Sequence, residues 1–140
     1  MRYINKDDLA TIMQMRFLLE SVENSDETLS YIEDMVISEV SAYIGSIYDV
    51  NQVFGNPPLR TGLLVRIISN MVCYRAIMRN SARKVPDSII DLSTWADNML
   101  IKIRDGIMTL PNNIPKNKGE DGKDIEILRY GHNRNSGWFV

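Results

Sequence analysis

The sequence predicts an all-α fold: a four-helix bundle-like domain with an apolar central third helix, plus an extended C-terminal tail. Apolar residues recur at steps of three and four through most of the first 111 residues, the period of a helix with one buried face. Short polar or proline-containing stretches separate these segments. After Pro111 the periodicity ends and turn-forming residues dominate, which indicates a change from body to tail.

The first helix is predicted to begin after Asn5, whose side chain can cap it. Asp7 and Asp8 would lie in its first turn, where negative charge is favoured. The polar stretch SVENSDET then predicts a turn. The apolar residues at helical spacing are Leu9, Ile12, Met13, Phe17 and Leu18.

The second helix is predicted over residues 26–48, with Ser25 or Asp26 as its cap. The stretch YDVNQVF at its end allows either a strand, or a loop or last helical turn, and we prefer the latter. Two successive prolines at 57 and 58 end any regular element there. The buried stripe of this helix is predicted to contain Leu29, Ile32, Met35, Val36, Val40, Tyr43, Ile44 and Ile47.

The third helix is predicted over residues 59–80, with Pro58 in its first turn. It is apolar on most sides, which is typical of a central helix. The fourth helix is predicted to open at Pro86 or Ser88 and to end at Gly106, a residue type that often ends a helix in the left-handed conformation. The apolar positions of the third helix are Leu63, Leu64, Ile67, Ile68, Met71, Val72, Ile77 and Met78.

Residues 1–111 are therefore predicted as a helical domain, and residues 112–140 as a flexible tail. Within the tail, IEILRY is predicted as either a short strand or a docking segment, and Trp138, Phe139 and Val140 favour a partner surface. We predict that Pro111 marks the boundary.

The composition is that of an ordinary soluble domain, with 44% hydrophobic and 24% charged residues among 140. A net charge of −2 disfavours broad binding to nucleic acid. A lone cysteine rules out an internal disulfide, and the N-terminus is not that of a secretory signal. The longest apolar stretch is interrupted by Arg66 and Arg75, so we expect no membrane span.

No residue pattern indicates an enzyme, a cofactor or a metal. His132 stands alone in a polar tail, and Cys73 lies in the most apolar helix, where cysteine usually acts as a small hydrophobe. One histidine and one cysteine do not make a zinc site, and no phosphate-binding loop is present in the sequence.

The charges are sorted along the chain. Lys and Arg are absent between Arg16 and Arg60, and acids are absent between Asp49 and Asp87. Three interpretations stay open: internal pairing between the second and third helices, a heterologous subunit interface that builds rings or filaments, and an arginine stripe that faces DNA. The candidate interface residues are Glu33, Asp34, Glu39, Arg75, Arg79, Arg83, Trp138 and Phe139.

The order of motifs over residues 1–111 resembles the Mu-like phage and prophage family of small head–tail connector (adaptor) proteins, long classed as a domain of unknown function. The motifs are a Y-I-x-K-D-D-L opening, SEVSAYIGSIY, PPL, CYR and IRDGIMTLP. The residues that carry the resemblance are Tyr3, Asp8, Leu9, Tyr48, Pro58, Leu59, Gly106 and Leu110.

The resemblance implies a non-enzymatic structural virion protein that assembles as a ring between portal and tail. Its expected partners are further copies of itself, the portal protein and a tail-completion protein. Its expected location is the virion neck, and the host cytoplasm during assembly. The alternative is a helical packaging protein associated with DNA or terminase through Arg75, Arg79 and Arg83, although direct nucleic-acid binding is disfavoured by the overall charge.

Overall fold

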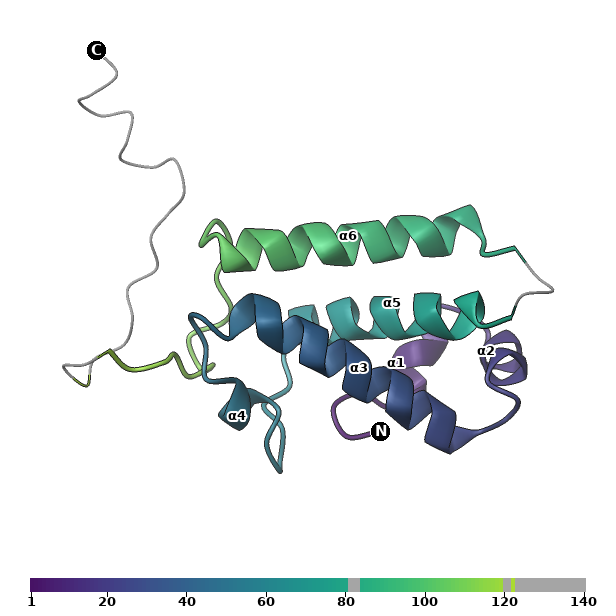
Figure 1. The fold of residues 1–140 in the computed structure, drawn as a ribbon, viewed down its shortest axis with the longest axis horizontal. Coiled ribbons are helices and arrows are strands. Elements are labelled where there is room, and N and C mark those ends of the chain that lie inside the picture. The colour runs from purple at the N-terminus through teal and green to yellow at the C-terminus, as the bar shows by residue number, and fades with distance from the viewer. Residues whose placement is uncertain (81–83, 120–121, 123–140) are drawn as a thin grey trace, which may run out of the picture.

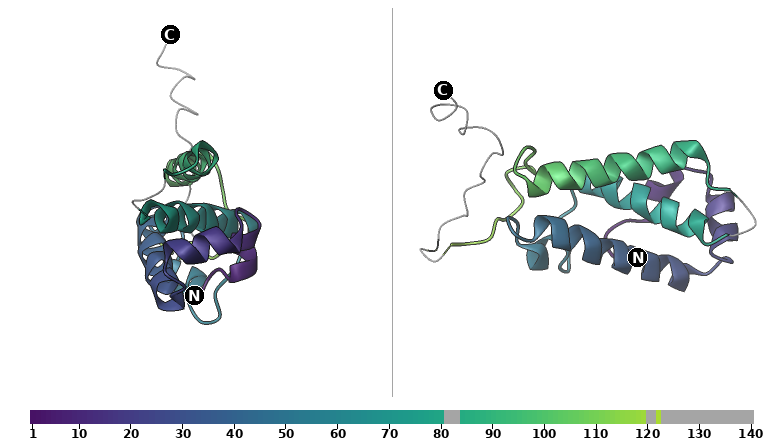
Figure 2. Two further views of the ribbon diagram at one scale, coloured as in Figure 1. Left: turned by 90° about the vertical axis from the view of Figure 1, so that its right-hand side faces the viewer. Right: turned by 45° about the horizontal axis from the view of Figure 1, so that its top comes forward.

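The computed structural model describes residues 1–80, 84–119 and 122, and this part of the chain is helical without strands, which confirms the all-α prediction (Figure 1). Helix α5 packs against α1, α2, α3 and α6, so the predicted central position of the apolar third helix is also confirmed (Figure 2). The helices are α1 Lys6–Ala10, α2 Met15–Ser21, α3 Asp26–Ile44, α4 Val50–Val53, α5 Gly62–Met78 and α6 Asp87–Arg104.

The predicted first helix is instead two short helices, α1 and α2. The cap prediction is confirmed, because Asn5 and Asp8 form a reciprocal capping box at the start of α1. The helix stops at Thr11, and Gln14 begins α2 with an extended backbone. The apolar spacing continues across the break, so periodicity alone did not reveal it.

Helix α3 begins at the predicted cap, where the Ser25 hydroxyl accepts a hydrogen bond from the Thr28 N–H. It ends at Ile44, earlier than predicted. Asp49 then caps the single-turn helix α4, so the stretch predicted as a loop or last helical turn forms a separate short helix. Between them, Tyr48 is 1% exposed and forms an isolated antiparallel bridge with Lys116.

Helix α5 begins at Gly62 rather than in the proline stretch, because the Thr61 hydroxyl caps it by accepting from the Leu64 N–H. Helix α6 begins at Asp87, directly after Pro86. Gly106 follows its end with a φ of 77°, so the predicted left-handed stop is confirmed. None of the helices within residues 1–80 and 84–119 has both the length and the apolar character that crossing a membrane requires.

A buried carboxylate on α3 holds the N-terminal segment against the bundle. Glu33 is 1% exposed, and its two oxygens accept hydrogen bonds from the backbone N–H groups of Arg2, Tyr3 and Ile4 at 2.7, 2.8 and 2.8 Å. The prediction that Glu33 belongs to an exposed interface is therefore wrong. Its carboxylate instead accepts hydrogen bonds from three backbone N–H groups inside the protein.

The same segment connects α3 to the start of α5 through Tyr3. The Tyr3 hydroxyl donates to the Leu59 carbonyl at 3.0 Å and accepts from the Thr61 N–H at 3.2 Å. Burial raises the pKa of this phenol. Residues 2–4 therefore bind two elements that are far apart in the sequence, and fix how α3 meets α5.

The packed body continues beyond Pro111, where the sequence analysis placed its boundary. Ile114 is 2% exposed within the hydrophobic core. Asn117 donates through its side chain to the Gly45 carbonyl at 2.6 Å and through its backbone to the Ile47 carbonyl at 2.8 Å. These two hydrogen bonds hold Asn117 beside the C-terminal end of α3.

We predict that Glu33→Gln lowers the free energy of unfolding by about 1–3 kcal/mol. The new NH2 group cannot accept a hydrogen bond, so a buried backbone N–H is left without an acceptor. Urea unfolding followed by circular dichroism measures this. Glu27→Gln, the same change at an exposed position of α3, should stay within about 0.5 kcal/mol. Equal losses in the two variants would contradict the role given to Glu33.

We also predict that Tyr48→Phe destabilises the protein by about 1–3 kcal/mol. The Tyr48 hydroxyl accepts a hydrogen bond from the backbone N–H of Leu110 at 2.8 Å, and phenylalanine leaves that buried donor without an acceptor. The matched control is Tyr31→Phe, since this tyrosine is 66% exposed. Thermal unfolding that affects both variants alike would refute the prediction.

Candidate functional site

The main candidate site is an apolar hollow between α3 and α5, which we call the α3/α5 groove. Its volume is about 580 Å³. Three of its side chains are large, apolar and mostly exposed: Tyr31 at 66%, Met35 at 60% and Met78 at 55%. The groove is lined by Thr28, Tyr31, Ile32, Met35, Arg75, Met78 and Arg79.

Helical geometry explains why these residues gather. Tyr31 and Met35 are four residues apart on α3, so they share one face, and Met78 lies on the same face of α5 as Arg75. Single exposed apolar residues are ordinary, whereas a contiguous group in a concave surface marks a place where another surface docks. The groove is therefore a candidate protein interface.

The prediction that Met35 belongs to the buried stripe of α3 is wrong, and Met78, one of the apolar positions of the central helix, is exposed as well. They lie at the edge of their apolar stripes, where the facing helix does not cover them, and period counting does not separate an edge position from a central one. The sequence did contain a signal. Tyr31 lies outside the predicted stripe yet pairs with Met35 at helical spacing, which widens the apolar face beyond what one neighbour buries.

Two of the predicted interface arginines border this groove. Arg75 forms an ion pair with Glu39 of α3. Arg79 donates to the backbone carbonyl of Ser21, at the end of α2, at 3.0 Å. Arg75 lies in the last turn of α5 and Arg79 directly follows the helix. The Arg75–Glu39 contact is a pairing within the chain, as the internal interpretation expected.

A third helix contributes a charge next to this ion pair. Partial burial raises the pKa of the Asp97 carboxyl on α6, and the negative charge of Glu39 raises it further. The positive charge of Arg75 opposes both effects. Charged groups of α3, α5 and α6 therefore influence one another near the Arg75 end of the groove.

The remaining predicted interface residues lie apart. Asp34 is exposed and pairs with Arg2 at 3.1 Å, near the N-terminal segment. Glu33, as described above, is buried. The predicted interface residues Arg83, Trp138 and Phe139 lie outside the described residues.

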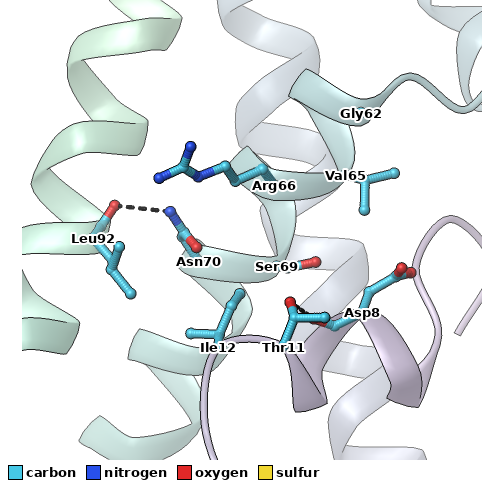
Figure 3. A pocket seen from close by; sticks show the side chains of 9 residues that line it. All are labelled: Asp8, Thr11, Ile12, Gly62, Val65, Arg66, Ser69, Asn70 and Leu92. Carbon is cyan, nitrogen blue, oxygen red and sulfur yellow. Dashed lines mark hydrogen bonds between the residues drawn. The ribbon is translucent and has the colours of Figure 1, made fainter.

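A second hollow, of about 420 Å³, lies where α1, α5 and α6 meet (Figure 3). Asn70 donates to the Leu92 carbonyl at 3.3 Å, and Asp8 accepts from Arg60 at 2.7 Å. The guanidinium of Arg66 lies 4.3 Å from the centre of the Trp95 ring. Within the described part of the chain, the buried Ser69 hydroxyl has no hydrogen-bond partner. Most polar groups of this hollow are thus engaged in holding helices together.

Of the two reactive side chains that the sequence analysis considered, the structure describes Cys73. Cys73 is fully buried, and burial raises the pKa of its thiol to about 12, so the thiol stays protonated and is a poor nucleophile. His132 lies outside the described residues. Among residues 1–80, 84–119 and 122, no cluster of three His, Cys, Asp or Glu side chains is arranged to hold a metal ion.

Comparison of the chain with protein-family models, with curated proteins and with solved structures finds no match.

We predict that Arg75 and Glu39 stabilise the fold as a pair. A double-mutant cycle with Arg75→Ala and Glu39→Ala should give a coupling energy of about 0.5–1 kcal/mol, because both side chains are partly exposed, at 29% and 35%. Added salt should reduce the coupling, since it screens exposed charges. Urea unfolding of the four proteins measures this, and strictly additive losses would show that the pair does not form in solution.

Proposed function

We propose that this chain is a structural assembly protein: a head–tail connector (adaptor) of a tailed phage or prophage, which forms a ring between portal and tail. The observation that carries the proposal is the α3/α5 groove. It combines three exposed large apolar side chains with two flanking arginines, on a body in which α1, α3 and α5 are capped by side chains. Such a surface fits a protein that acts by docking.

The resemblance of residues 1–111 to the small connector family is the reason that we propose the head–tail junction of a phage as the place of action. Tyr3 and Tyr48, two residues that carry the resemblance, are core residues, 2% and 1% exposed, with hydroxyls that join distant segments. Gly106 adopts a left-handed conformation at the stop after α6. These motif residues therefore have physical roles in the fold, which supports reading them as family determinants. In this proposal the partners are further copies, a portal protein and a tail-completion protein, in the virion neck.

The alternative, a packaging protein that binds DNA through its arginines, has weaker support. The charge of Arg75 is compensated by Glu39, and Arg79 donates to a backbone carbonyl. The exposed acid Glu23 lines a surface hollow together with Arg79. Duplex binding depends on uncompensated positive charge and weakens steeply with salt. A groove with an apolar floor fits a protein partner better.

Deletion of the gene in the phage or prophage that encodes it tests this function. We expect filled heads and free tails that do not join, seen by electron microscopy of lysates, because the connecting ring is missing. A wild-type copy supplied in trans should restore joined particles. Normal tailed particles after deletion would refute the connector role, and empty heads would favour the packaging alternative.

The groove gives this test a matched pair of variants. Met78→Glu places a charge in the apolar groove and should fail to complement the deletion. Ile107→Glu makes the same kind of change at another exposed residue, 57% accessible and outside the groove, and should complement. Complementation by both variants would show that the function does not require the groove.

A further inference from the structure

We propose that Met35 and Met78 form a modification site for peroxide, at which oxidation of the two thioethers to sulfoxides makes the α3/α5 groove polar and opposes docking. The chemistry of this site is independent of the proposed function. Its consequence for assembly rests on that function and deepens it, because it names a condition under which the groove is not usable. Exposure, position and side-chain chemistry single out these two residues.

Exposure separates Met35 and Met78 from the other methionines of the chain, which has eight in all. Met35 and Met78 are 60% and 55% exposed, Met1 is 37% exposed, and Met71 is buried at 3%. Since peroxide reaches exposed side chains first, the two groove methionines are its preferred targets. The remaining four methionines are partly buried against the hydrophobic core: Met13, Met15, Met99 and Met108.

The two most exposed methionines line the same groove from different helices. Met35 belongs to α3, whereas Met78 is the last residue of α5. Together with Tyr31 they are the three large, apolar and mostly exposed side chains of the groove. The apolar character of this surface therefore depends on two thioethers, and one chemical reaction changes both.

The reaction transfers one oxygen atom to each sulfur. A sulfur lone pair attacks hydrogen peroxide, the O–O bond breaks, and the products are a sulfoxide and water. The sulfur is oxidised by two electrons and the peroxide is reduced. The sulfoxide is polar where the thioether was apolar. Methionine sulfoxide reductases reverse the change with two thiols, which become a disulfide as water is released.

A sulfoxide in the groove opposes the docking of an apolar surface. Docking would remove the sulfoxide oxygens from water without supplying a hydrogen-bond donor. An unpaired polar group of this kind lowers the affinity by about tenfold. Both residues are exposed, so their oxidation leaves the hydrophobic core untouched. The loss is therefore confined to the groove, and it is reversible.

Site-resolved oxidation of the folded, full-length protein tests the preference for the groove. The protein is treated with limiting hydrogen peroxide, and mass spectrometry of its peptides measures the oxidised fraction of each methionine over time. We expect Met35 and Met78 to oxidise at least about tenfold faster than Met71, and faster than each partly buried methionine. In urea the rates should converge, because unfolding removes the differences in exposure. Similar rates in the folded protein would overturn the proposal.

Retention on a phenyl column measures the change in surface polarity. Oxidised protein should elute earlier than untreated protein with the same helix content by circular dichroism, and sulfoxide reductases of both stereospecificities should restore its retention. Met35→Leu/Met78→Leu should lose most of the peroxide effect, since leucine is apolar and has no sulfur. Met15→Leu/Met108→Leu, at two partly buried positions outside the groove, should keep it. An undiminished shift in the groove variant, or no shift in the wild-type protein, would overturn the proposal.

The effect on assembly is measured in a lysate of the deletion strain. Purified protein is added untreated, or after peroxide treatment and removal of the peroxide by catalase, and joined particles are counted by electron microscopy. We expect oxidised protein to join at least about tenfold fewer particles, and the reductases to restore joining. Treated and untreated samples of Met35→Leu/Met78→Leu should join equal numbers.

The joining assay separates the two proposals. Equal joining by oxidised and untreated wild-type protein would overturn the effect of oxidation on docking and leave the connector role intact. No joining by the untreated protein would overturn the connector role and, with it, the consequence for assembly. The oxidation rates and the column retention decide on the modification site in either case.

Discussion

The carboxylate of Glu33 is the contact on which the arrangement of α3 and α5 depends. A buried carboxylate is costly unless it is hydrogen-bonded, and three consecutive backbone N–H groups of residues 2–4 supply the donors. The segment held in this way places Tyr3 between Leu59 and Thr61, at the start of α5. The N-terminal segment therefore links the Glu33 side of α3 to the start of α5. Tyr31 and Met35 lie elsewhere on α3 and line the groove.

Those parts of the fold that depend on local chemistry were predicted from the sequence. The caps at Asn5 and Ser25 and the left-handed stop at Gly106 follow from side chains acting on nearby backbone groups. The central position of α5 followed from its composition. The break between α1 and α2 and the early end of α3 were missed, because the apolar period continues through both and tertiary contacts decide where the helix stops.

The candidate site was harder to predict because it depends on how two helices are spaced. Glu33 has the sequence context of a surface acid, and only its three distant backbone donors make it a core residue. Met35 and Met78 have the context of core residues, and only the limited cover of neighbouring helices exposes them. Pairing of Arg75 with Glu39 was among the interpretations of the sorted charges, but sequence did not choose between internal and intermolecular contacts.

The energetics of the groove bear on how an assembly through it would behave. Covering the exposed parts of Tyr31, Met35 and Met78 would contribute roughly 3–5 kcal/mol. Association costs about 4–15 kcal/mol in lost translational and rotational freedom. A single groove contact is therefore too weak to hold two free copies together firmly. In a closed ring each copy contacts two neighbours. The contact that closes the ring forms between copies that are already joined, so its entropic cost is smaller. A surface of this strength therefore needs further contacts, or several copies held side by side, before it contributes to a stable assembly.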